Sequence, residues 1–325
     1  MLGPVLLFLL GFVLLIKGGD WFVDGAVGLS HRFRLPELLI GATVVSIGTT
    51  LPEVMVSAQA AMEGNAGISY GNAIGSVICN TSLIAAVTIA IRPGGIDRKT
   101  LVLPAAAFFT AAAVYAVTAY TTGRFERWNG ILLLAFFILY MAATILQMKR
   151  HPETAEAEED EGGDGKPKAL WQEILYLILG AALIAVGARL LVDNGTILAK
   201  ALGVPDSVIG LTMVALGTSL PELITAITSL VKGHGSLSLG NIIGANLFNI
   251  VLVSGAAITI SPFAIPAEKT VFGGINSSLV IDLPVMLAVM SIMCLPALKK
   301  GELKRWQGIL LLCIYAAFTI YQFVS

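Results

Sequence analysis

Long apolar runs, separated by short polar connections, make up most of the chain. A helix needs about 20 mostly apolar residues to cross a bilayer, and ten runs satisfy this requirement. We predict ten membrane-spanning helices, over residues 3–29, 36–62, 67–91, 100–121, 127–149, 169–199, 206–231, 236–260, 276–297 and 304–324. The pattern therefore predicts an all-α polytopic membrane protein.

The composition agrees with a chain whose main solvent is lipid. Hydrophobic residues make up 56% of the chain and charged residues only 13%, whereas soluble proteins have about 25% charged residues. The net charge of −1 gives no basic surface for nucleic acid. Cys79, Cys294 and Cys313 are too few and too dispersed for a disulfide framework or a zinc site.

Basic residues in the connections predict the orientation. With the N-terminus outside, the inner connections hold fourteen Lys and Arg residues and the outer connections hold four. Because cytoplasmic loops are enriched in these residues, we expect both termini outside, in a multi-pass protein of the cell membrane. The connection 151–168 is acidic and lacks large apolar residues, which is typical of a solvated linker. We expect this linker in the cytoplasm, and its acids lack the spacing of an EF-hand loop.

The sequence repeats itself with a shift of 169 residues. The shift aligns "GTTLPE" (48–53) with "GTSLPE" (217–222), and "GNAIGSVICN" (71–80) with "GNIIGANLFN" (240–249). Seventeen of the 45 positions from 36 to 80 are identical to their equivalents. Shared Gly, Pro, Glu and Asn residues in one fixed register indicate a duplication.

The two copies start five predicted helices apart, so equivalent helices cross the membrane in opposite directions. Many secondary transporters are built from inverted repeats of this kind, with the substrate held between the halves. We therefore expect two five-helix repeats, 1–150 and 169–325, which form one membrane domain and are joined by the linker 151–168.

Each copy places a glutamate and a proline within a predicted spanning helix. A carboxylate at the helix centre costs about 2.5–3.5 kcal/mol even on the mild insertion scale, so Glu53 and Glu222 indicate a function that compensates this cost. Pro52 and Pro221 lack an N–H group and leave the carbonyl four residues earlier without its helical partner. Freed carbonyls at membrane depth are tolerated where they line a cavity.

Further polar residues fall one helical turn apart on the helices of both motifs. With the glutamates, these stripes hold Ser46, Thr49, Ser57, Asn72, Ser76, Asn80, Thr218, Asn241 and Asn249, and the motifs add Thr50 and Ser219. All offer oxygen atoms, which disfavours zinc, copper and iron. Two carboxylates with additional oxygens suit Ca²⁺, which takes about six to eight oxygen ligands, better than Mg²⁺, which dehydrates reluctantly.

Two further functions are possible for a buried glutamate pair that suits Ca²⁺. Buried carboxylates can also bind protons, so a calcium/proton antiporter is the alternative. An intramembrane enzyme could use the glutamate pair as acid and base, but no nucleophile–histidine pair or metal ligand set accompanies the pair. We therefore expect a transporter and not an enzyme.

At the level of whole motifs, "GTTLPE…GNAIGSVICN" and "GTSLPE…GNIIGANLFN" resemble the two α-repeats of sodium/calcium exchangers, within the cation/calcium exchanger superfamily. The resemblance implies a secondary antiporter that exchanges Na⁺ for Ca²⁺ by alternating access. These ions are then its transported substrates, and no cofactor is expected. Nothing in the sequence indicates an oligomeric state, and we expect a monomer to suffice for transport.

The resemblance also implies roles for single residues. A central calcium site would use Glu53, Glu222 and the carbonyl groups of Thr49 and Thr218. Sodium sites would share the carboxylates, and their further ligands would be the carbonyls of Ser46 and Ala215, the side chains of Thr49 and Thr218, and Ser76. Asn80 and Asn249 would complete the centre. The first and sixth helices are expected to slide over the others during transport.

Two departures from the family pattern are informative. Asn249 stands where some relatives carry an acid, which disfavours the potassium-dependent branch. Ala245 stands where relatives have serine, opposite Ser76, so the inner sodium site is expected to lack one hydroxyl. The proton-coupled branch carries "GNA-x-E" acids where this chain has "GTTLPE" and "GTSLPE".

Overall fold

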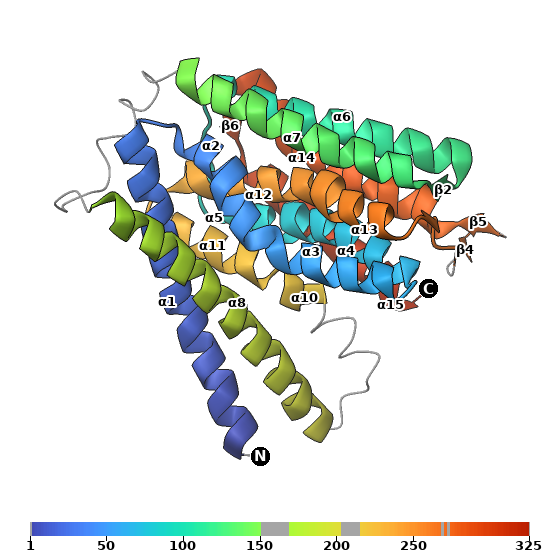
Figure 1. The fold of residues 1–325 in the computed structure, drawn as a ribbon, viewed down its shortest axis with the longest axis horizontal. Helices are drawn as coiled ribbons and strands as arrows, with labels where there is room; N and C mark the ends of the chain where they lie inside the picture. The colour runs from blue at the N-terminus through green and yellow to red at the C-terminus, as the bar shows by residue number, and fades with distance from the viewer. Residues whose placement is uncertain (1, 151–168, 203–214, 268–269, 272–273, 325) are drawn as a thin grey trace.

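A computed structural model of the protein describes residues 2–150, 169–202, 215–267, 270–271 and 274–324. The chain forms a bundle of helices, with short strand pairs in the connections (Figure 1). In order, the helices and π-helical turns (η) of the first half are α1 Leu2–Phe33, α2 Glu37–Ile40, η1 Gly41–Val45, α3 Ser46–Met62, α4 Ala66–Cys79, η2 Asn80–Ala85, α5 Ala86–Ile91, α6 Arg98–Thr122 and α7 Arg127–Arg150. Those of the second half are α8 Leu170–Ala201, α10 Ala215–Thr218, α11 Leu220–Val231, α12 Gly235–Phe248, η5 Asn249–Val253, α13 Ser254–Ile260, η6 Ser278–Asp282, α14 Leu283–Lys300 and α15 Arg305–Val324.

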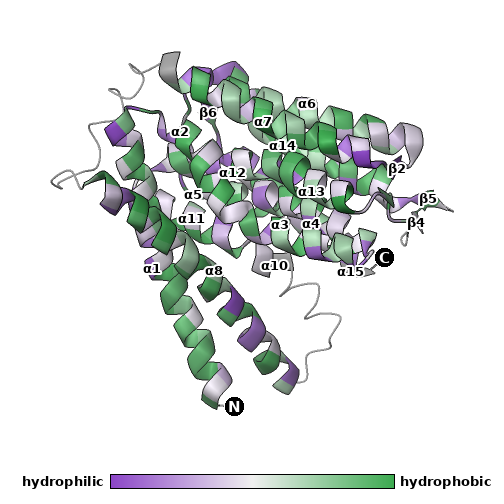
Figure 2. Ribbon diagram, viewed as in Figure 1, coloured by the Kyte–Doolittle hydropathy of each residue, from purple (hydrophilic) through white to green (hydrophobic). Residues whose placement is uncertain are grey.

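Several neighbouring helices run on into one another, because π-helical turns join them end to end. Among the described residues, eight helical segments are long and apolar enough to cross a membrane: Leu2–Phe33, Glu37–Met62, Ala66–Ile91, Arg98–Thr122, Arg127–Met148, Leu170–Ala201, Gly235–Ile260 and Ser278–Lys300. Figure 2 shows that apolar residues cover these helices along most of their length. The prediction of a mostly helical membrane protein with many spanning segments is confirmed.

The predicted helix ends differ from the observed ends by a few residues. Helix α1 continues past residue 29 to Phe33, because the polar residues there do not break a helix and Pro36 does. Helix α14 continues past residue 297 to Lys300 and ends at Gly301, whose positive φ of 68° stops a helix. The linker 151–168 and the first part of the predicted helix 206–231 lie outside the described residues.

Helices α1 and α8 form a long antiparallel pair whose far ends project away from the bundle (Figure 1). Glycines bring the two backbones close together: a Cβ atom at Gly11 would lie 2.8 Å from the carbonyl oxygen of Gly187, and one at Gly18 would lie 2.9 Å from that of Gly180. Small residues at such seams let helices approach closely in lipid. The pair is therefore packed as one tight unit.

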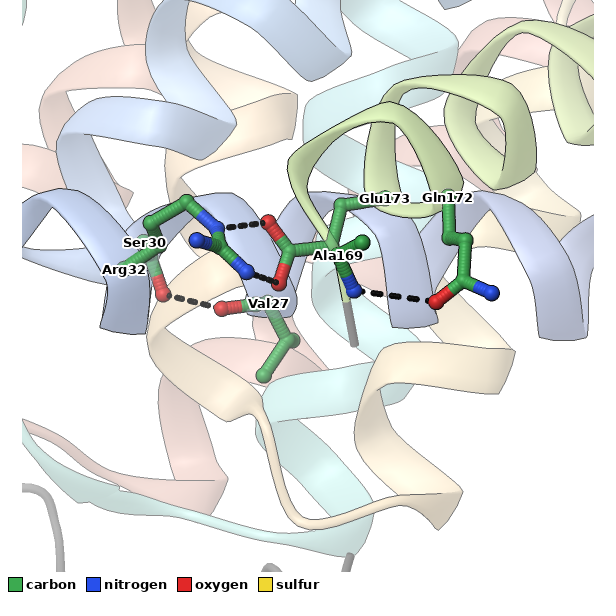
Figure 3. A network of polar contacts seen from close by, with 6 residues as sticks. All are labelled: Val27, Ser30, Arg32, Ala169, Gln172 and Glu173. Atoms are coloured by element: carbon green, nitrogen blue, oxygen red, sulfur yellow. Dashed lines mark hydrogen bonds and ion pairs between the residues drawn. The ribbon is translucent and has the colours of Figure 1, made fainter. Parts of the chain in front are cut away.

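An ion pair closes one end of this unit. Arg32, in the last turn of α1, donates from Nε and Nη2 to the two carboxylate oxygens of Glu173 on α8, at 2.7 and 3.2 Å (Figure 3). Two parallel bonds to one carboxylate fix orientation as well as distance. Glu173 is buried.

The structure adds features that the apolar pattern does not predict. The π-helical turns η2 and η5 begin at Asn80 and Asn249, the equivalent asparagines of the two motifs. The two-residue strands pair as β1 Gly94–Gly95 with β6 Glu302–Leu303, β2 Arg124–Phe125 with β3 Phe263–Ala264, and β4 Thr270–Val271 with β5 Ile275–Asn276.

Helix α12 is the centre of the bundle. Every residue from Leu237 to Phe248 is buried, and α12 contacts α2, α3, α6 and α11. Gly240 and Gly244 allow this position, since a Cβ at Gly240 would lie 2.1 Å from the Leu38 carbonyl oxygen. A Cβ at Gly244 would lie 2.3 Å from the Ser46 hydroxyl. Two helices from opposite halves of the chain thus meet in the core.

Candidate ion-binding site

The two repeated motifs meet in the interior. Glu53 lies on α3 and Glu222 in the first turn of α11, and both side chains are fully buried. Their carboxyl groups are near enough to interact electrostatically. Pro52 and Pro221, the preceding residues, line the same small cavity of about 10 Å³ between α1, α3, α8 and α11. The structure therefore brings together the glutamates that the sequence predicts as ligands.

Neither carboxylate has a hydrogen-bond donor or a basic side chain as its partner among the described residues. No hydrogen bond reaches the oxygens of Glu53 or Glu222 within that part of the chain, and the ion pairs found there involve other acids. A buried carboxylate without a partner is strongly destabilising. A cation between two such groups would remove this cost.

Two hydroxyl groups of the first motif lie near the second glutamate. Thr49 and Thr50 are polar neighbours of the Glu222 carboxyl group, and both are buried. The hydroxyl of Thr50, like that of Ser219, has no hydrogen-bond partner among the described residues. These free oxygens add ligand capacity beside the carboxylates.

Ser46 and Thr49 also contact the second repeat. The Ser46 hydroxyl donates to the backbone carbonyls of Gly41, at 2.7 Å, and Asn241, at 2.9 Å. The Thr49 hydroxyl donates to Oδ1 of Asn241 at 3.2 Å. These bonds hold the side chains, and the Thr49 hydroxyl also makes a long contact of 3.5 Å with the Ser46 carbonyl.

The equivalent asparagines, Asn80 and Asn249, begin the π-helical turns η2 and η5, which contact α11 and α3 respectively. Both are fully buried. Asn80 has no partner for either polar atom among the described residues, and Oδ1 of Asn249 is likewise unpaired there, although Nδ2 of Asn249 donates to the Ala245 carbonyl at 3.0 Å. π-Helical turns inside α-helices occur frequently at functional sites. Two amide oxygens are thus available.

The second copy of the motif does not form one continuous helix. Helix α10 ends at Thr218, and α11 begins at Leu220. The intervening Ser219 has ψ near 4°, so the predicted single helix over 206–231 is wrong at this point. Pro221 is compatible with the break, because a proline fits the first turn of a new helix, but Pro52 lies within the continuous helix α3, so the proline alone does not cause it.

The remaining predicted residues lie around this break. Thr218 is half-buried on α10, and Ala215 begins that helix. Ser76 is buried on α4, which contacts α10. The helices and turns that carry the predicted residues contact one another, α10 with α4, α3 with α11 and η5, and α11 with η2.

No group of three or more His, Cys, Asp or Glu side chains placed to hold a metal ion is found in the described ranges. An ion at this site would therefore complete its shell with hydroxyl, amide and carbonyl oxygens. Such a mixed oxygen set fits Na⁺ and Ca²⁺.

Comparison with known protein families decides the relationship. The family model described as sodium/calcium exchanger protein matches residues 3–146 and 173–324, which include both motifs. The chain belongs to the sodium/calcium exchanger family.

Relatives in this exchanger family cover nearly the whole chain. An uncharacterised membrane protein of Methanocaldococcus jannaschii is 36% identical over 312 residues, which are 95% of this chain and 94% of the relative. A sodium/calcium exchanger of Methanosarcina acetivorans is 32% identical over 98% of both chains. Among solved structures, the sodium–calcium exchanger NCX_Mj, soaked with 2.5 mM Na⁺ and 10 mM Sr²⁺, superposes with a TM-score of 0.82 at 32% identity, covering 97% of both chains.

Within this exchanger fold, two contributors were missing from the predicted ligand set. Asn241 holds the side chains of Ser46 and Thr49. Its equivalent Asn72 donates to the Glu53 carbonyl at 3.1 Å and to the Ser57 hydroxyl at 2.8 Å. The signal was available, because both asparagines follow the first glycine of the repeated "GN" segments.

Proposed function

We propose that this protein is a secondary antiporter that exchanges Na⁺ for Ca²⁺ across the membrane by alternating access. The observation that carries the proposal is the pair of buried carboxylates, Glu53 and Glu222, which come from equivalent repeat positions and lack a protein partner among the described residues. Membership of the exchanger family and the exchangers among its relatives support the same function.

The Ca²⁺ ion would be held by both carboxylates together with the backbone carbonyls of Thr49 and Thr218. Two carboxylates balance the charge of one Ca²⁺ ion and supply up to four of its oxygen ligands. Sodium ions would share the carboxylates and use further oxygens, from the carbonyls of Ser46 and Ala215, the side chains of Thr49, Thr50, Thr218, Ser219 and Ser76, and the amides of Asn80 and Asn249.

The same charges couple the two ion movements. Without a cation, two carboxylates would remain buried and unpaired while the protein changes state, which is costly at membrane depth. Either Ca²⁺ or sodium ions remove this cost. The protein would therefore change state readily only when loaded, and the result is exchange rather than leak.

The proposed architecture is two inverted repeats, 1–150 and 169–325, with ten spanning helices in one membrane domain. Eight segments meet the criteria for spanning the membrane, and α11 and α15 would be the other two of the ten proposed spanning helices. The linker 151–168 and the connections that hold most of the Lys and Arg residues would lie in the cytoplasm, with both termini outside.

Calcium flux into proteoliposomes, with sodium, potassium and proton gradients imposed one at a time, tests this function. A sodium gradient at constant pH should drive calcium uptake, and a potassium gradient should not. Uptake driven only by the proton gradient would overturn sodium coupling and favour a calcium/proton antiporter. Flux without any counter-gradient requirement would contradict exchange itself.

A further inference from the structure

A cluster of three charges ties α1 to the end of α11. Lys232, which caps α11, donates to Oδ1 of Asp24 at 2.7 Å and to the carbonyl of Asp20 at 3.1 Å, and it lies 3.5 Å from Oδ1 of Asp20. The packing beneath this cluster is close, since a Cβ at Gly19 would lie 2.7 Å from both Ile224 and Thr228 on α11. Helix α1 thus covers one face of α11.

The repeat register places three other charges at the equivalent positions. The shift of 169 converts Asp20 and Asp24 of α1 into Arg189 and Asp193 of α8, and Lys232 into Glu63. The backbone supports this register, because Glu63 caps α3 as Lys232 caps α11. Each cap is followed by a glycine with positive φ, 74° at Gly64 and 91° at Gly233.

Both sets contain one cation and two carboxylates, but the cation lies on a different helix in each. The first set has two carboxylates on α1 and a cation on α11. The second has a cation and a carboxylate on α8 and a carboxylate on α3. Each set therefore combines one cation with two carboxylates, and each would link a helix of the α1–α8 pair to the end of a motif helix.

Only the first set is assembled. Arg189 and Asp193 lie 3.6 Å apart on α8, with side chains 85% and 62% exposed, and the far part of α8 contains hydrophilic residues (Figure 2). Glu63 instead accepts a hydrogen bond from Gln59 at 2.6 Å. The residues equivalent to Ile224 and Thr228 are Met55 and Gln59 on α3, and both are exposed.

The α1–α8 pair is itself symmetric, in contrast to its contacts with the bundle. The shift of 169 converts the Gly11–Gly187 contact into the Gly180–Gly18 contact, and both are present. Symmetry within the pair lets it keep one structure while its place on the bundle changes. The Arg32–Glu173 ion pair (Figure 3) has no such counterpart, since Ala201 and Pro4 stand at the equivalent positions. It joins α1 to α8 and would hold the unit together in either place.

We propose that these six charged residues form two alternative latches that position the α1–α8 pair. In the present state the first latch is formed, with Lys232 in contact with Asp20 and Asp24. In the opposite state α8 covers the exposed face of α3, and Arg189 lies between Asp193 and Glu63 while Lys232 is released. The proposal rests on alternating access in the proposed function, since inverted repeats exchange their conformations between states.

Latches of this kind suit a transporter because they are weak. Partly exposed ion pairs are worth little each, so neither latch would trap the protein in one state. Removing one latch should shift the population of states about two- to five-fold, which corresponds to the usual range for such pairs.

Cysteine cross-linking tests the pairing directly. In a background with Cys79, Cys294 and Cys313 replaced by alanine, two pairs are introduced: Asp24→Cys with Lys232→Cys, and Glu63→Cys with Asp193→Cys. Both pairs should form disulfides on oxidation in proteoliposomes, block exchange, and release it on reduction. The matched controls recombine the same positions, as Asp24→Cys with Glu63→Cys and Asp193→Cys with Lys232→Cys, and neither should cross-link.

A third substitution links the two latches. Adding Lys232→Gln to the Glu63→Cys, Asp193→Cys pair should raise its initial cross-linking rate about two- to five-fold, because the competing latch is lost. No cross-link in this pair with or without Lys232→Gln, or a rate that Lys232→Gln leaves unchanged, would overturn the proposal. Sodium-driven calcium uptake by the reduced proteins is measured separately, so loss of the proposed function is distinguishable from loss of the latch.

Charge reversal provides a test without cysteines. Glu63→Lys should slow exchange, because it places a second cation beside Arg189. Combining Glu63→Lys with Arg189→Glu restores one cation and two carboxylates and should recover most of the rate. A double variant as slow as the single variant, with both proteins folded, would contradict the Glu63–Arg189 contact.

Discussion

The two copies of the motif contain nearly the same residues but follow different backbone paths. In the first copy, helix α3 continues through Pro52 from Ser46 to Met62. In the second, the helix stops at Thr218 and restarts at Leu220, so that Pro221 lies in a first turn. Yet Glu53 and Glu222 are both fully buried, on helices α3 and α11 that contact each other. The motif sequence therefore determines which side chains are buried at the centre, whereas packing against the rest of the protein determines the local backbone conformation.

The asparagines of the two copies differ in the same way. Asn241 accepts hydrogen bonds from Ser46 and Thr49 of the opposite repeat, whereas Asn72 donates to the Glu53 carbonyl of its own repeat. A site shared by inverted repeats has to be reached from each side in turn. Unequal contacts in equivalent copies are therefore expected of one state in a transport cycle.

The largest effect is expected where the two copies are most alike. Glu53→Gln and Glu222→Gln should each abolish calcium exchange, because each removes a negative charge and a bidentate ligand from the ion. Calcium flux in proteoliposomes measures the loss. Glu302→Gln, an exposed glutamate in a connection, is the matched control and should exchange normally. Substantial calcium flux in either folded motif variant would remove that carboxylate from the site.

Substitution of the first glycine in the two "GNxxG" segments should destabilise the protein by different amounts in the two copies. Gly240→Ala brings a Cβ atom to 2.1 Å from the Leu38 carbonyl oxygen, so α2 or α12 must move, at about 3 kcal/mol or more. At the equivalent Gly71, a Cβ would have no described atom within 4 Å, and Gly71→Ala should cost little. Thermal unfolding in detergent compares them. Equal losses would show that both segments are packed alike.

Sequence alone was sufficient to predict a mostly helical membrane protein and to single out two glutamates that the structure buries. Apolar runs of spanning length have few other structures available, and a glutamate repeated at membrane depth is too costly to lack a role. The break at Ser219 was not predictable, because "GTTLPE" and "GTSLPE" have the same local preferences. Its cause lies in packing against distant segments, as does the contact between Asn241 and Ser46.

The prolines test the difference in backbone path directly. Pro52→Ala returns an N–H group to the interior of α3, where it can bond the Gly48 carbonyl and stabilise the helix by up to about 3 kcal/mol. Calcium affinity should fall, because a carbonyl beside the site is no longer free. Pro221→Ala should change little, since the first turn of α11 does not use that N–H. Thermal unfolding and calcium titration of exchange are measured for both. A larger change at Pro221 than at Pro52 would reverse the interpretation.

The smallest effect is expected where the copies differ by one hydroxyl. Ser76 in the first copy is replaced by Ala245 in the second, and both are buried. Ala245 follows Gly244, which packs against the Ser46 side chain, and its carbonyl binds Nδ2 of Asn249. With α12 running outward in the proposed topology, Ala245 lies one turn inward of Asn249, on the cytoplasmic side of the carboxylates. Ala245→Ser would add a neutral oxygen there without adding charge.

One neutral ligand should strengthen sodium binding from the cytoplasmic side by roughly 0.5–1.5 kcal/mol, the worth of a net hydrogen bond. Calcium affinity should change less, because its main ligands are the two carboxylates and the Thr49 and Thr218 carbonyls. The measurement is exchange at varied cytoplasmic sodium in the wild type and Ala245→Ser. Ala257→Ser, a buried alanine on α13, controls for an added hydroxyl away from the site. If half-saturation by sodium is unchanged, or calcium affinity shifts more than sodium affinity, then the inner sodium site is not adjacent to Ala245. A hydroxyl next to a dehydrated sodium ion would act as a ligand and would change the sodium affinity.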